Sequence, residues 1–164
     1  MQYYICPDDM ETTNGQILFS GSVLSFQKSC RAMTGNAGNW YSWPASTAGG
    51  NKESGNEENS VCPRGWQLTV NAATDPKSYY YLIRTVYNIS ESKDERIRLF
   101  PMSFVRSGHY NQGSPDDRAN DTIYWSSTAD GSNYAYYLSS GSGSLSPQRS
   151  NLKFYGFSVR CVSR

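Results

Sequence analysis

The side chains that could perform catalysis or hold a metal ion are few, and they gather between His109 and Asp121. His109 is the single histidine, so a serine or cysteine nucleophile would have only one candidate histidine base. Asp116, Asp117 and Asp121 offer the carboxylate oxygens that calcium prefers, but their spacing is not that of a calcium loop, and a solvated loop is the favoured interpretation. Glycine-rich phosphate loops and zinc-binding His-Glu-x-x-His helices are absent from the sequence. We therefore predict no catalytic residue, no metal site and no cofactor.

Recognition chemistry is concentrated in residues 133–155, NYAYYLSSGSGSLSPQRSNLKFY. Tyrosine supplies a large, rigid, amphipathic contact area at low entropic cost, while serine, glycine and asparagine supply adaptable hydrogen bonds. Antibody loops favour the same residues, which indicates binding rather than catalysis. A polar sheet edge with Ser/Gly turns would have a similar composition, so a purely structural interpretation stays open. The regular placing of apolar residues within the stretch favours an ordered surface.

Alternation with a period of two predicts which side chains of this stretch face a core. Leu138 and Leu145 are expected to point inward. Their neighbours on the opposite face are expected to point outward, namely Tyr137, Ser139, Ser144 and Ser146. In the last predicted strand, inward and outward residues are expected to alternate in the order Phe157, Ser158, Val159 and Arg160. One face of the sheet should then be polar and aromatic.

One helix is predicted among the elements that must position these residues. Asp75 can accept hydrogen bonds as an N-cap, and Pro76 fits the first turn of a helix. An apolar stripe at helical spacing follows through about residue 87 and consists of Tyr79, Leu82, Ile83 and Val86. This helix is expected to pack on a sheet.

The rest of the chain is expected to form short strands and loops. Strands are predicted at 16–19, 22–26, 99–105, 122–127, 134–139, 144–146 and 157–162, and the last four should form an antiparallel meander. Pro101 places the strand over 99–105 at a sheet edge or a bulge. Residues 48–60 and 107–121 are rich in turn formers and are predicted as loops, the second long enough to be functional.

The composition favours one domain over residues 1–164, because a chain of this length can close one sizeable core. Hydrophobic residues make up 37% and aromatic residues 14%, which favours strands and ordered loops around Tyr, Trp and Phe rather than a helical bundle. The 15 basic and 14 acidic residues are scattered without a basic stripe, so no nucleic-acid partner is expected. No apolar run approaches the ~20 residues that cross a bilayer, so no membrane insertion by this domain is expected.

The four cysteines are an even number without a Cys-x-x-Cys pair of the redox or zinc type, and they are Cys6, Cys30, Cys62 and Cys161. Two disulfides are the natural interpretation, which indicates an extracellular or cell-surface location. Four buried free thiols in a cytosolic protein are the alternative.

Three segments carry a family resemblance: SVCPRGWQL at 60–68, YWSST at 124–128 and GFSVRCV at 156–162. In order and spacing they resemble the Fibrobacter succinogenes major paralogous domain, and WYSWPASTA at 40–48 resembles the aromatic segment ahead of its Cys-Pro-x-Gly-Trp motif. The likeness covers residues 40–162. That family is similar to proteins with a C-type-lectin or formylglycine-generating-enzyme-like fold and to the variable proteins of diversity-generating retroelements.

The resemblance implies an α+β, C-type-lectin-like fold with short antiparallel strands, one or two helices and long ordered loops. It also implies disulfides pairing Cys62 with Cys161 and Cys6 with Cys30. The family's changeable positions fall here on Tyr137, Ser139, Gly141, Ser144, Ser146, Arg149, Ser150, Asn151, Leu152 and Tyr155. Four of these coincide with the outward set obtained from alternation alone. All ten changeable positions, together with Tyr134 and Tyr110, are the predicted ligand-binding residues.

The sequence thus predicts a non-enzymatic ligand-binding or adhesion module that presents a recognition surface on a rigid scaffold to a protein or glycan. The sugar-binding Glu-Pro-Asn, Gln-Pro-Asp and Trp-Asn-Asp signatures of calcium-dependent lectins are absent, so calcium-mediated sugar binding is not expected. A structural subunit of a cell-surface assembly is the alternative. An oxidase of the formylglycine-generating type is disfavoured, because its catalytic cysteine pair has no convincing counterpart.

Overall fold

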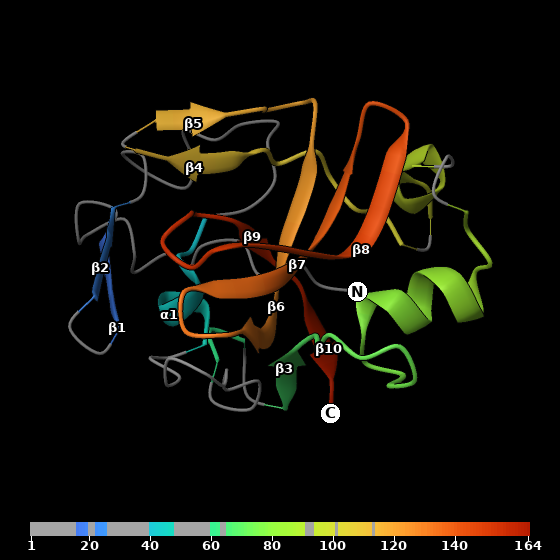
Figure 1. The fold of residues 1–164 in the computed structure, drawn as a ribbon, viewed down its shortest axis with the longest axis horizontal. Helices are drawn as coiled ribbons and strands as arrows, with labels where there is room; N and C mark the ends of the chain where they lie inside the picture. The colour runs from blue at the N-terminus through green and yellow to red at the C-terminus, as the bar shows by residue number, and fades with distance from the viewer. Residues whose placement is uncertain are drawn as a thin grey trace.

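A computed structural model describes residues 16–19, 22–25, 40–47, 60–62, 65–90, 94–100, 102–112 and 114–164, with backbone alone for the first two ranges. The chain forms a mixed α+β structure that is rich in antiparallel strands and has short helices (Figure 1). The described helices do not reach the length and apolarity of a membrane-spanning segment.

A four-stranded sheet in the order β8–β7–β6–β9 forms the centre of the fold. β6 (Thr122–Asp130), β7 (Tyr134–Gly141) and β8 (Ser144–Leu152) form the predicted antiparallel meander, and each strand is longer than predicted. β9 (Ser158–Val159) lies parallel to β6 on its other side, so the prediction of one further antiparallel strand over 157–162 is wrong. That segment is divided, and its second part, Cys161–Ser163, pairs with a strand outside this sheet. The meander therefore places β8 at one edge of this sheet.

A β-bulge interrupts the pairing of β7 with β8. Tyr137 is paired with Arg149 and Ser139 with Ser146, so two residues of β8, Pro147 and Gln148, lie against the single residue between them on β7. A bulge of this kind adds one residue to a strand and shifts its alternation by one. A second irregularity lies in β6 between Trp125 and Ala129.

Three two-stranded sheets surround the central one. β1 (Gln16–Phe19) pairs with β2 (Ser22–Ser25), β3 (Trp66–Leu68) with β10 (Cys161–Ser163), and β4 (His109–Asn111) with β5 (Ser114–Asp116). Figure 1 shows β4–β5 at one end of the molecule and β3–β10, with the C-terminus, at the other. The predicted loop over 107–121 thus contains a short hairpin.

The disulfide between Cys62 and Cys161 confirms one predicted pairing. Its Cα atoms are 5.7 Å apart, within the usual range for a disulfide, and it spans 99 residues. It ties the segment before β3 to β10, which β3 already pairs with in the sheet. Cys6 and Cys30 lie outside the described residues.

The predicted helix begins at Tyr79 and is a π-helix over Tyr81–Val86 (η3). Its cap is Ser78, whose Oγ accepts a hydrogen bond of 2.9 Å from the Tyr81 backbone N–H. Asp75 instead accepts from the Lys77 N–H in the turn before the helix. The assignment of Val86 to the apolar stripe is wrong, because its side chain is 56% exposed, whereas Leu82 and Tyr87 pack against the core cluster.

The predicted strand over 99–105 is wrong. A 3₁₀ helix over Asp94–Arg98 (η4) leads into a turn, in which the Ser103 N–H donates to the Leu99 carbonyl and the Phe104 N–H to the Ile97 carbonyl. These local hydrogen bonds occupy the backbone groups that a sheet would need. Phe104 is buried in the core, whereas Phe100 is 91% exposed.

Both faces of the central sheet are covered by apolar clusters. On one face, Tyr124, Leu138 and Leu145 pack against Tyr79 and Ile83 of the helix. The cluster on the other face consists of Trp43, Ile123, Trp125, Ala135, Tyr137 and Phe157, with Trp43 supplied by α1 (Trp43–Ser46). The second cluster buries the floor on which the candidate site lies.

Coverage on both faces corrects two predictions about the last strand. Ser158 and Arg160 were expected to point outward, yet they are buried, at 2% and 4% exposure. The Arg160 guanidinium lies over the Phe104 ring, 4.1 Å from its centroid. Residues 157–160 do alternate between the two faces of the sheet as predicted, but both faces are covered by other side chains.

Candidate functional site

Strand register brings seven of the predicted ligand-binding residues to one face of the central sheet. Side chains directly opposite one another in a ladder share a face. The Tyr137–Arg149, Ser139–Ser146 and Gly141–Ser144 pairs, with Asn151 opposite Ala135, therefore continue the face that carries Trp125 and Ile123. We call this set the β7–β8 face, and it consists of Tyr137, Ser139, Gly141, Ser144, Ser146, Arg149 and Asn151.

The bulge is what unites these residues on one side. Without it, the even-numbered Ser144 and Ser146 would share a face with Gln148, and the odd-numbered Arg149 and Asn151 would point to the other face. Because Pro147 and Gln148 together oppose one residue of β7, the alternation changes after Ser146. The sequence alone gives no sign of this shift.

Exposure divides the β7–β8 face into a floor and an accessible edge. Ser144 and Arg149 are exposed and Ser146 and Asn151 are half-buried, as expected for residues on the edge strand β8. Tyr137 and Ser139 of the inner strand are buried, at 7% and 9% exposure. The prediction that they point to solvent is corrected: they lie on the predicted face, but neighbouring side chains cover them.

The Tyr137 ring belongs to the aromatic cluster beneath this face. Its centroid lies 4.9 Å from that of Phe157 and 5.9 Å from that of Trp125. Trp125 itself stacks on Phe157 at 4.0 Å. Burial raises the pKa of the Tyr137 hydroxyl above its usual value, while the nearby Arg149 acts in the opposite direction. Tyr137 therefore supports the face rather than projecting from it.

Three predicted residues lie on the opposite face of the sheet. Tyr134 pairs with Leu152 and Tyr136 pairs with Ser150, so these side chains point away from the β7–β8 face. Tyr134 is 45% exposed, Ser150 is exposed and Leu152 is half-buried. Register thus separates Tyr134, Ser150 and Leu152 from the other predicted positions on these strands.

Tyr155 and Tyr110 approach the site from outside the meander. The centroid of the Tyr155 ring lies 6.0 Å from that of the Phe157 ring and 5.8 Å from that of the His109 imidazole. The ring centroids of Tyr110 and Trp40 are 6.1 Å apart, and Tyr110 exchanges two backbone hydrogen bonds with Gly156. Both tyrosines are half-buried. They join the β4–β5 hairpin to the aromatic cluster under the β7–β8 face.

Asp121 is a member of the site that sequence reasoning placed elsewhere. A Cβ built on Gly141 would overlap the Asp121 carboxylate, so this carboxylate fills the space that a side chain at position 141 would occupy. Burial, followed by the nearby Asp117 carboxylate, raises the pKa of Asp121, while His109, Arg106 and Arg149 oppose the shift. The acidic loop and the β7–β8 face are therefore adjacent.

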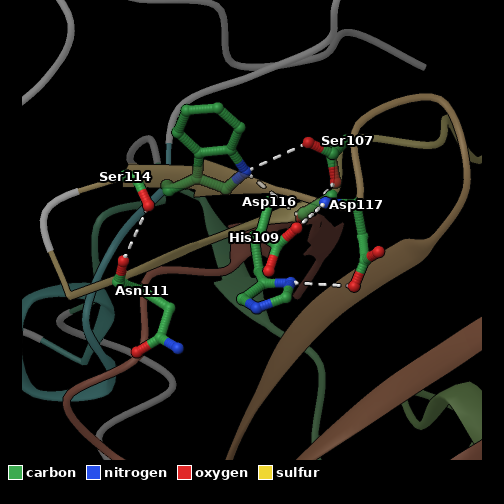
Figure 2. A network of polar contacts seen from close by, with 8 residues as sticks. Ser107, His109, Asn111, Ser114, Asp116 and Asp117 are labelled. Carbon is green, nitrogen blue, oxygen red and sulfur yellow. Dashed lines mark hydrogen bonds and ion pairs between the residues drawn. The ribbon is translucent and has the colours of Figure 1, made fainter.

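The β4–β5 hairpin supplies a polar cluster (Figure 2). Asp121 is tied to this cluster, because its backbone N–H donates to the Asp117 carbonyl at 3.0 Å. His109 pairs with Asp116 across the hairpin, and Asp117 follows β5 in a left-handed conformation with φ +51°. The His109 Nδ1 lies 3.7 Å from the Asp117 Oδ2, and the Asp117 N–H donates to the Asp116 Oδ1. The sequence shows the run of acidic residues after the single histidine. That this run lies close to Gly141 follows only from the tertiary structure.

Neither a protein-family model nor a curated protein nor a solved structure significantly matches the chain.

Proposed function

We propose that this chain is a binding module with a C-type-lectin-like fold, which uses the β7–β8 face to contact a protein or glycan at or outside the cell surface. The observation that supports this proposal is the gathering of seven separately predicted positions on one face by register and bulge. A disulfide that spans 99 residues is consistent with an oxidising compartment.

A fixed scaffold explains how such a face would bind. The exposed edge residues stand on a floor of stacked aromatic rings and paired strands. A surface already held in its binding geometry loses little conformational entropy on association, which favours affinity. Arg149 supplies charge and bidentate hydrogen bonding at the centre of the edge strand, and Ser144, Ser146 and Asn151 supply neutral hydrogen bonds around it.

The joining of Cys62 to Cys161 supports a binding role over an oxidase of the formylglycine-generating type. These two cysteines tie β10 to the segment before β3, so the bridge has a structural task. We infer no catalytic residue on the β7–β8 face.

The proposal is tested by screening the full chain against arrays of glycans and of cell-surface proteins, and then measuring the affinity of variants for any ligand found. Arg149→Glu should weaken binding by at least tenfold, because it reverses the charge at the centre of the face. Arg164→Glu makes the same charge change at the C-terminus beside β10 and should bind as the parent does. Equal binding by Arg149→Glu and the parent would contradict the site.

A structural role in a cell-surface assembly is the competing outcome. Sedimentation of the parent and of the Arg149→Glu variant distinguishes ligand binding from a structural role in an assembly. Self-association of the parent that Arg149→Glu abolishes, with no ligand in either array, would replace the binding proposal by the assembly role.

A further inference from the structure

The β4–β5 hairpin brings three metal-ligating side chains together next to the β7–β8 face. His109 and Asp116 face each other in the register of the hairpin, and Asp117 follows directly. One donor atom from each of these residues lies within 4.8 Å of the others. Figure 2 shows the His109 imidazole and the Asp117 carboxylate directed at one another.

The His109 ring is held in place by its neighbours. It lies 5.8 Å from the Tyr155 ring and 6.0 Å, edge to face, from the Phe157 ring. Its Nδ1 atom is buried and has no hydrogen-bond partner among the described residues. The distance of 3.7 Å between the His109 Nδ1 and the Asp117 Oδ2 is too long for a hydrogen bond. A buried ring nitrogen without a partner is costly, which calls for a partner such as a metal ion.

Negative charge accumulates around this nitrogen. Asp116 and Asp117 are adjacent in the chain, and the backbone N–H of a third acidic residue, Asp121, donates to the Asp117 carbonyl at 3.0 Å. A dication between His109 and the two carboxylates would relieve the repulsion between them.

We propose that His109, Asp116 and Asp117 bind a divalent transition-metal ion of the Zn²⁺ class. Imidazole together with carboxylates suits Zn²⁺, whereas Ca²⁺ takes oxygen ligands alone. Three protein ligands leave one position of a tetrahedral ion for water or for an oxygen of another molecule. The three ligands are not members of the β7–β8 face, so the metal site stands or falls independently of the proposed ligand binding.

The test titrates ZnCl₂ into the full chain, without a purification tag, by calorimetry and follows the imidazole nitrogens by ¹⁵N NMR. His109 is the single histidine of the chain, so its two ring nitrogens give the only imidazole signals. We expect one Zn²⁺ per chain and a shift of the Nδ1 resonance at the same stoichiometry. His109→Gln and Asp117→Asn should each weaken binding by at least tenfold.

Asp130→Asn, on β6 outside the cluster, is the matched control and should bind Zn²⁺ as the parent does. Circular dichroism of each variant shows whether it remains folded. The proposal is overturned if millimolar Zn²⁺ leaves the Nδ1 resonance unchanged, or if folded His109→Gln binds Zn²⁺ as tightly as the parent. Binding of Ca²⁺ without a shift of the imidazole signals, in place of Zn²⁺, would also overturn it.

Discussion

Arg149 lies directly opposite Tyr137 in the β7–β8 ladder, but the arginine is exposed while the tyrosine ring is buried against Phe157. Neighbouring positions on one face of a sheet thus have different tasks. The tyrosine forms part of the core that supports the face, and the arginine is free to meet a partner molecule. Substitutions at the two positions should therefore affect different properties.

Tyr137→Ala is expected to lower the free energy of unfolding by about 3 kcal/mol or more, because it leaves a cavity beside Trp125 and Phe157. Arg149→Ala should change it by no more than about 0.5 kcal/mol, as is usual for an exposed side chain. Urea unfolding of both variants measures the difference. Equal stabilities would show that the Tyr137 ring is not packed as described, and a loss of ligand binding in Tyr137→Ala would reflect unfolding as much as contact.

Removal of the Cys62–Cys161 disulfide should be strongly destabilising. In the chain-entropy estimate, a bridge across 99 residues contributes about 4.7 kcal/mol, within a usual range of about 2–5 kcal/mol. The Cys62→Ser, Cys161→Ser double variant should unfold at a correspondingly lower guanidinium concentration. An unchanged midpoint would mean that β3 and β10 hold this end of the fold without the bridge.

Trp125→Phe tests the hydrogen bond that ties the central sheet to residues before α1. The Trp125 Nε1 donates to the Tyr41 carbonyl at 2.9 Å, and the same carbonyl accepts from the Phe157 N–H at 3.0 Å. Loss of this bond and of part of the indole should lower stability by about 2 kcal/mol. Trp66→Phe, at a half-buried position on β3, should cost less in the same denaturant experiment. A larger loss in Trp66→Phe would contradict the ranking.

Asp121→Asn should stabilise the protein at neutral pH. Burial and the Asp117 carboxylate raise the pKa of Asp121 in the folded state, so ionisation of this carboxyl costs stability as pH rises through the folded pKa. The neutral amide avoids that cost, and its advantage should disappear below the unfolded pKa, where Asp121 is protonated in both states. Thermal unfolding at pH 7 and near pH 3 measures this, with Glu95→Gln, at an exposed position on η4, as the charge-matched control. A lower Tm for Asp121→Asn at pH 7 would contradict the expectation.

Local patterns in the sequence determined the meander and its core contacts. Strict alternation placed Leu138 and Leu145 inward, and both are buried at 1% exposure or less. Turn-forming residues separated β6, β7 and β8 close to where they end. The helix followed from an apolar stripe, although its cap is Ser78 rather than Asp75. These features rest on contacts between near neighbours in the chain, which a single sequence records.

The composition of the site was also readable from the sequence, whereas its shape was decided by the tertiary structure. Alternation separates the two faces of a strand but does not say whether a face meets water, so Tyr137, Ser158 and Arg160 were assigned to solvent and are buried. The bulge opposite Leu138 depends on how two strands pair, and the approach of Asp121 to Gly141 depends on how a loop returns to the sheet. Such contacts join residues through packing in three dimensions, and residue types alone do not specify them.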